Sequence, residues 1–163
     1  MPLRLLFVAL LVAIACRSDS NPFGLQEAAF TPATDAVQGS GTVEELRARR
    51  DAWLATRPRN YFVQEQLGCF CGDGPDFRPA ILEVRNGEVT RAWGMRTGKR
   101  FTPRKGALQS VEQLFDEAIA YAERGSRVVV KYDRLRGYPV VLILGTPEND
   151  GGVIYSLGRL SRL

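Results

Sequence analysis

The dipeptide Asn86-Gly87 constrains the fold most, because it lies between two runs of alternating apolar and polar residues. Asn-Gly is the pair preferred in two-residue turns that join antiparallel strands. A turn at this point places Val84 opposite Val89 and predicts a hairpin over residues 80–93. The apolar face of that hairpin is then expected to carry Leu82, Val84, Val89 and Trp93, and the other face Glu83, Arg85, Glu88 and Thr90.

Two segments carry the signature of a helix start. In TVEEL, from Thr42, and SVEQL, from Ser110, a hydroxyl residue precedes Glu or Gln by three positions. In such a capping box the hydroxyl accepts from the later amide, and the later side chain returns to the cap. The first helix is predicted to run to about Thr56, before Pro58. The second repeats apolar residues at spacings of three and four until Gly125.

The remaining segments favour strands, over residues 61–71, 127–132, 138–144 and 153–160. An α+β fold follows, with an antiparallel β-sheet packed by one or two helices. Each capping box opens a helix that three strands follow, so the chain is either a tandem repeat of helix plus three strands or the coincidence of two caps.

Residues 1–15 are predicted to be a lipoprotein signal peptide. Arg4 supplies the positive start, and residues 5–14 are an apolar run too short to span a bilayer. The tetrad Ala13-Ile14-Ala15-Cys16 resembles the lipobox of bacterial lipoproteins, which implies cleavage before Cys16 and its acylation. The alternative is an ordinary signal peptide that is cleaved nearby. The resemblance implies an exported protein anchored in a membrane of the bacterial cell envelope, facing the periplasm or the outside.

Residues 16–41 are expected to be the lipidated cysteine and a flexible tether, because Ser, Asn, Pro, Gly, Thr and Ala dominate there. A coil of about 25 residues reaches roughly 25–30 Å. Residues 42–163 are then expected to form a single α+β domain.

Several of these motifs occur together in one known family. Cys69-Phe70-Cys71, the Asn86-Gly87 hairpin, SVEQLF from Ser110, and Tyr132-Asp133 with Gly137-Tyr138-Pro139 resemble, in order and spacing, the uncharacterised DUF6174 family of bacterial secreted and lipoprotein domains. The resemblance covers about residues 42–145. It implies an exported α+β module and supplies no catalytic residue.

Cys69 and Cys71 are the other cysteines of the chain, which has no histidine. Residues two apart in a strand lie about 6.6 Å apart, near the upper limit for a disulfide. We expect a structural disulfide or two buried thiols. A thiol-disulfide redox pair, a soft-metal site and a bond between molecules remain open alternatives, although no histidine can complete a metal site.

A run of six basic residues and no acidic one lies between Thr90 and Gln109. It could bind an anionic surface of the envelope, or it could be a solvated loop. The run consists of Arg91, Arg96, Lys99, Arg100, Arg104 and Lys105.

Other functions lack support in the sequence. The 22 basic residues are interspersed with 18 acidic ones, which argues against nucleic-acid binding. There is no calcium loop, phosphate loop, zinc motif or nucleophile elbow. We therefore expect no cofactor and no catalysis, but a binding or structural module held to a membrane by its lipid; its protein partner is not indicated.

Overall fold

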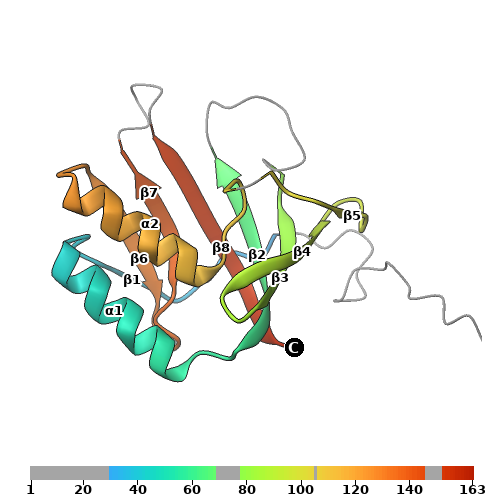
Figure 1. The fold of residues 1–163 in the computed structure, drawn as a ribbon, viewed down its shortest axis with the longest axis horizontal. Helices are drawn as coiled ribbons and strands as arrows, with labels where there is room; N and C mark the ends of the chain where they lie inside the picture. The colour runs from blue at the N-terminus through green and yellow to red at the C-terminus, as the bar shows by residue number, and fades with distance from the viewer. Residues whose placement is uncertain (1–29, 69–77, 105, 146–151) are drawn as a thin grey trace, which may run out of the picture.

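The computed structural model describes residues 30–68, 78–104, 106–145 and 152–163 (Figure 1). Cys16, Cys69, Cys71 and Lys105 lie outside these ranges, as does the predicted signal peptide. No helix within the described ranges is long and apolar enough to cross a membrane. The elements, in chain order, are β1 (Ala36–Gln38), α1 (Val43–Thr56), β2 (Asn60–Gly68), β3 (Ala80–Arg85), β4 (Glu88–Gly94), β5 (Arg100–Phe101), α2 (Val111–Glu123), β6 (Val128–Asp133), β7 (Pro139–Leu144) and β8 (Val153–Arg162).

The eight strands form one sheet in the order β1-β6-β7-β8-β2-β3-β4-β5, and every neighbouring pair is antiparallel. Both helices lie on one face of the sheet, which we call the helix face (Figure 1). The main core fills the space between the two helices and the sheet. Leu46 and Trp53 of α1 and Leu114 and Phe115 of α2 are buried in it. The α+β fold with a helix-packed antiparallel sheet is therefore confirmed.

The two predicted helix caps differ in one bond. At α2 the capping box is complete, because Ser110 accepts from the Gln113 amide and Gln113 returns to the Ser110 amide. At α1 the Thr42 hydroxyl accepts from the Glu45 amide at 3.3 Å as expected. The Glu45 carboxylate, however, accepts from the amides of Ser40 and Gly41 instead of Thr42. Glu45 thus ties α1 to the chain before it.

The start of α2 is largely buried and is hydrogen-bonded to the sheet through Ser110 and Val111. The Ser110 hydroxyl donates to the Gly87 carbonyl at 2.5 Å, which fixes the helix to the β3–β4 turn. The Val111 amide donates to the Tyr61 hydroxyl at 3.1 Å, and that hydroxyl donates to Glu112 at 2.6 Å. Burial and the neighbouring Glu112 carboxylate raise the pKa of Tyr61, so the hydroxyl keeps its proton.

The Glu112 carboxylate is also paired with a cation. Arg57 Nε lies 2.9 Å from Glu112 Oε1, and both side chains are largely buried. Arg57 is the residue that ends α1, so this ion pair links the end of one helix to the start of the other.

The predicted hairpin is present, with Val84 opposite Val89 and Arg85 opposite Glu88. The register shifts between Glu83 and Val84, because Glu83 pairs with Arg91 and leaves Thr90 as an extra residue. A bulge reverses which side chains face which side of a sheet. The prediction that Trp93 shares the apolar face of Leu82 is therefore wrong: Trp93 pairs with Ile81 and contacts Phe62 on the opposite face.

Residues 30–41 are part of the domain, so the prediction of a flexible tether does not hold for them. β1 pairs with β6, and the Gly39 amide donates to the Val130 carbonyl at 2.9 Å. The pairing of β7 with β8 ends at Val141 and Ser156, although β8 continues to Arg162. Beyond that point the two strands separate, which leaves a split in the sheet. Pro32 forms a bridge with Gly158 of β8, so the N-terminal segment closes this split.

A glycine permits this close approach. A Cβ atom on Gly158 would lie 2.5 Å from the Thr31 carbonyl oxygen and 2.7 Å from Gln64 Oε1. Gln64 Oε1 itself accepts from the amides of Thr31 and Arg159, at 3.1 and 3.3 Å. The N-terminal segment, β2 and β8 therefore meet at one point where no side chain fits.

The two helix-plus-strand units repeat in chain order, α1 with β2-β3-β4 and α2 with β6-β7-β8. Both sets of strands run in the same order across the sheet but in opposite directions, since β2 and β8 are antiparallel. A rotation that places one set of strands on the other must keep the order of the strands and reverse their direction. Such a rotation turns the sheet over, so it also exchanges the two faces of the sheet. Because both helices lie on one face, no single rotation superimposes the units (Figure 1).

We predict that Gly158→Ala lowers the free energy of unfolding by about 1–3 kcal/mol, because the added methyl group meets backbone that cannot move aside. Gly68→Ala on the neighbouring strand is the matched control, since its Cβ would lie 3.6 Å from Ile154 Cβ, an ordinary contact. Urea unfolding of both variants measures the difference. Equal losses in the two variants would show that the N-terminal segment is not tightly packed at Gly158.

Candidate anionic-surface site

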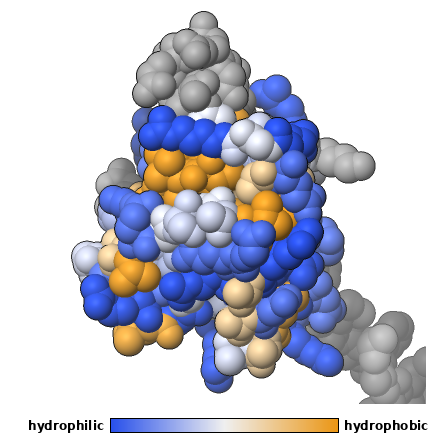
Figure 2. Space-filling view, turned by 90° about the vertical axis from the view of Figure 1, so that its left-hand side faces the viewer, coloured by the Kyte–Doolittle hydropathy of each residue, from blue (hydrophilic) through white to orange (hydrophobic). Residues whose placement is uncertain are grey.

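Few large apolar side chains are highly exposed among the described residues. Figure 2 shows apolar residues on the side turned away from β5, framed by hydrophilic ones. Among the described residues, the large apolar side chains that are exposed are Leu54, Leu135 and Leu163. The candidate site is therefore sought among the polar residues, and first at the predicted basic run.

The structure gathers four of the six predicted basic residues on the β4–β5 hairpin. Arg91 lies on β4, Arg96 and Lys99 in the turn, and Arg100 on β5, which is an edge of the sheet. We call these four residues the basic edge. Arg96, Lys99 and Arg100 are exposed, and the side chain of Arg91 is 41% exposed.

The turn that carries Arg96 and Lys99 is held by backbone bonds. The Gly94 carbonyl accepts from the amides of Thr97 and Gly98, at 3.2 and 2.8 Å, and the Gly94 amide donates to the Lys99 carbonyl at 3.0 Å. The two side chains therefore project from a closed turn of defined shape.

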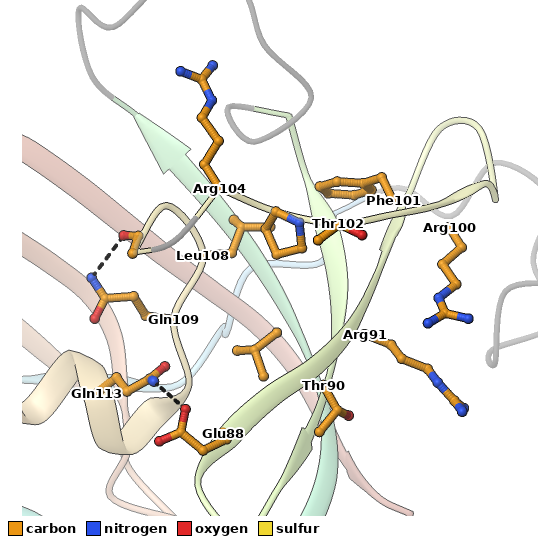
Figure 3. A pocket seen from close by; sticks show the side chains of 13 residues that line it. Glu88, Thr90, Arg91, Arg100, Phe101, Thr102, Arg104, Leu108, Gln109 and Gln113 are labelled. Atoms are coloured by element: carbon orange, nitrogen blue, oxygen red, sulfur yellow. Dashed lines mark hydrogen bonds between the residues drawn. The ribbon is translucent and has the colours of Figure 1, made fainter.

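Arg91 and Arg100 extend to the same side of the hairpin (Figure 3). Arg100 pairs with Trp93, and Arg91 precedes Trp93 by two residues, so both lie on the face opposite the helices. Arg91 also shares the buried Glu83 carboxylate with Arg85, at 3.3 and 2.5 Å respectively. Arg104 points in another direction, away from both arginines (Figure 3).

A hollow of about 420 Å³ lies between this hairpin and the start of α2. Its wall is apolar at Val89, Phe101 and Leu108, and Glu88 accepts from Gln113 at 2.9 Å inside it (Figure 3). The arginines do not converge on the hollow, and the Glu88 carboxylate would repel a small anion there. Outward-pointing cations on an exposed edge fit a broad anionic surface better than one small ion.

A second polar cluster, which the sequence analysis did not single out, lies inside the protein. Glu65 of β2 is fully buried and accepts from the Gln109 amide at 3.1 Å. The Gln109 side chain donates to the Tyr155 hydroxyl at 2.9 Å and to Glu117 of α2, and Tyr155 donates to Glu117 at 3.1 Å. The signal in the sequence was a charged residue at an inward position of a strand, between Val63 and Leu67.

The surroundings of Glu65 favour its neutral form. Burial raises its pKa from 4.5 to about 8, the hydrogen bond from Gln109 lowers it, and the Glu117 charge raises it further. The carboxyl group therefore keeps its proton at neutral pH. Glu65 is fully buried and does not line the hollow, although its partner Gln109 does.

The other predicted site residues are not placed. Cys16, Cys69, Cys71 and Lys105 lie outside the described residues, so lipidation and the state of the cysteine pair remain predictions. Within the described ranges there is no cluster of three or more His, Cys, Asp or Glu that could hold a metal ion.

The model of one protein family matches residues 45–149, and its description is "Family of unknown function (DUF6174)". The matched range includes β2 to β7 with the basic edge, most of α1 and all of α2. No curated protein and no solved structure matches the chain.

We predict that Glu65→Gln removes part of the pH dependence of stability. In the wild type the folded state binds more protons than the unfolded state between about pH 5 and pH 8, so stability falls as the pH rises through that window. Gln keeps the shape and the acceptor of the protonated acid without the charge. The groups facing it, Glu117, Tyr155 and Gln109, are unchanged.

The measurement is the free energy of urea unfolding of both proteins at pH 5 and at pH 8. From pH 5 to pH 8, we expect the free energy of unfolding of the wild type to fall by about 1–3 kcal/mol more than that of the variant. A constant difference across this range would mean that Glu65 is already ionised in the folded protein.

Proposed function

The chain belongs to DUF6174, a family of unknown function that assigns it no activity, and we propose that it is an exported, lipid-anchored binding module of the bacterial cell envelope, without catalytic activity. Its ligand is an anionic component of the envelope, and the basic edge binds it.

The proposed anchor is supported by the first 16 residues. They combine an early arginine, a short apolar run and the tetrad that ends in Cys16. Two or more acyl groups on this cysteine would give a stable attachment, whereas one chain alone is marginal.

The proposed ligand is supported by one observation above all: on the β4–β5 hairpin at the sheet edge, three cations close together in sequence, Arg96, Lys99 and Arg100, are exposed. The segment from Thr90 to Gln109 contributes no acidic residue to neutralise them. Each basic group near an anionic surface contributes about 1 kcal/mol, and the attraction is screened by salt.

The anchor predicts a specific N-terminal peptide. We expect protein from intact cells to begin at Cys16 and to carry both a thioether-linked diacylglyceryl group and an amide-linked acyl chain, as judged by mass spectrometry. Cys16→Ser should abolish the acylation and the cleavage before residue 16. Cys69→Ser is the control and should leave the acylated N-terminus intact. A wild-type chain that starts elsewhere or lacks acyl groups would refute the anchor.

The ligand chemistry predicts retention on an immobilised polyanion. On a dextran-sulfate column, the variant Arg96→Gln, Lys99→Gln, Arg100→Gln should elute at clearly lower salt than the wild type, because the cations of one surface are removed together. The control Arg127→Gln, Lys131→Gln, Arg162→Gln removes the same net charge from exposed residues elsewhere. Equal shifts in both variants would mean that net charge alone determines retention.

A further inference from the structure

We infer that the basic edge lies on the anionic headgroups of the same bilayer that holds the lipid anchor, so that the β4–β5 hairpin faces the membrane. This inference rests on the proposed anchor at Cys16, and it names the source of the anionic ligand. Two observations carry it: where the N-terminal chain joins the domain, and where the exposed cations lie.

The described chain begins beside the hairpin that carries the cations. Phe30 packs against Ile81 of β3 and against Met95, which directly follows β4. Met95 is fixed to the sheet by a hydrogen bond from its amide to the Pro79 carbonyl at 2.9 Å. The next residue along the chain is Arg96, so the anchored segment meets the domain next to the basic edge.

The same face of the sheet carries the remaining cations. Trp93 pairs with Ile81 on one side and with Arg100 on the other, so Phe30 and Arg100 lie on the face opposite the helices. Phe30 also lies beside Gly158 of β8, since a Cβ atom on Gly158 would lie 3.2 Å from Phe30 Cε2, so Phe30 spans from β8 across β2 to β3. The middle strand of that span, β2, is three strands from β5 and four strands from β1. At about 4.8 Å per strand, the basic edge is roughly 14 Å from it and the β1 edge roughly 19 Å.

The length of the anchored segment keeps the domain close to the bilayer. Only 14 residues lead from Cys16 to Phe30. Fourteen residues span at most about 50 Å even when fully extended, so the anchor keeps the domain within that distance of the bilayer. The anchored segment reaches the domain on the face of the sheet that carries Phe30 and Arg100.

The charges of the two edges agree with this orientation. The β5 edge presents Lys99 and Arg100 to solvent, with Arg96 in the adjoining turn. At the β1 edge Arg134 is paired with Asp35 at 2.7 Å, and Lys131 of β6, opposite Gln38 of β1, is exposed. A lipid-anchored domain that can rotate about its tether will therefore turn its β5 edge toward an anionic bilayer.

The test measures how close two positions of the anchored protein come to the lipid. The acylated full-length protein is reconstituted in vesicles of phosphatidylcholine, with or without phosphatidylglycerol. A fluorescent amino acid replaces either Thr102, just after β5, or Leu135 in the distant β6–β7 turn. Both residues are exposed. Lipids with a spin label on the headgroup quench fluorophores that lie near the surface.

We expect stronger quenching at position 102 than at position 135 in vesicles that contain phosphatidylglycerol. The difference should disappear in phosphatidylcholine alone and in 1 M salt, where the Debye length is about 3 Å. It should also be lost in Arg96→Gln, Lys99→Gln, Arg100→Gln, but not in the charge-matched control Arg127→Gln, Lys131→Gln, Arg162→Gln.

Equal quenching at both positions, or quenching that ignores the charge of the lipid, would overturn the inference while the anchor still stands. Failure of the anchor gives a different result. In that case the protein would not float with vesicles of either composition in 1 M salt, and both proposals would fall.

Discussion

The start of helix α2 holds the two layers of this protein together. A helix leaves its first amides without partners inside the helix, and here they are buried, so the sheet and the cap must supply acceptors. The Ser110 hydroxyl accepts from the Gln113 amide and donates to the β3–β4 turn. The Tyr61 hydroxyl accepts from the Val111 amide and donates to Glu112. Through Glu112 the network reaches Arg57 at the end of α1. One buried polar network thus connects both helices to the sheet, through the hydrogen bonds of Ser110 and Tyr61 and the ion pair of Glu112 with Arg57.

Features set by neighbouring residues could be predicted from the sequence. The α2 capping box, the Asn86-Gly87 turn and the positions of the later strands all follow from local chemistry, and the structure agrees. The orientation of Trp93 could not be predicted, because it depends on a bulge at Thr90 that only pairing with β3 defines. The prediction of a flexible tether is wrong for residues 30–41 for the same reason. Its composition is that of a linker, but its partners, Val130 and Gly158, lie about a hundred residues further along the chain.

The candidate site was predictable as a set of charges but not as a shape. The absence of acidic residues around Arg96 and Lys99 is visible in the sequence, whereas the separation of Arg104 from the hairpin, and the outward direction of Arg91 and Arg100, appear only in the fold (Figure 3). The charges have a second effect. β5 is an edge strand, and cations on an edge oppose pairing with another chain. The residues proposed to face an anionic surface thus also oppose extension of the sheet at this edge.

The bridge between Pro32 and Gly158 has a consequence for how the protein folds. Nearly the whole described domain separates these two residues, so the split in the sheet can close only when both ends of the chain are present. Contacts of such long sequence separation form slowly, because the entropy of closing the loop must be overcome first. The residues of the described domain that are synthesised first are therefore among the last to reach their native partners.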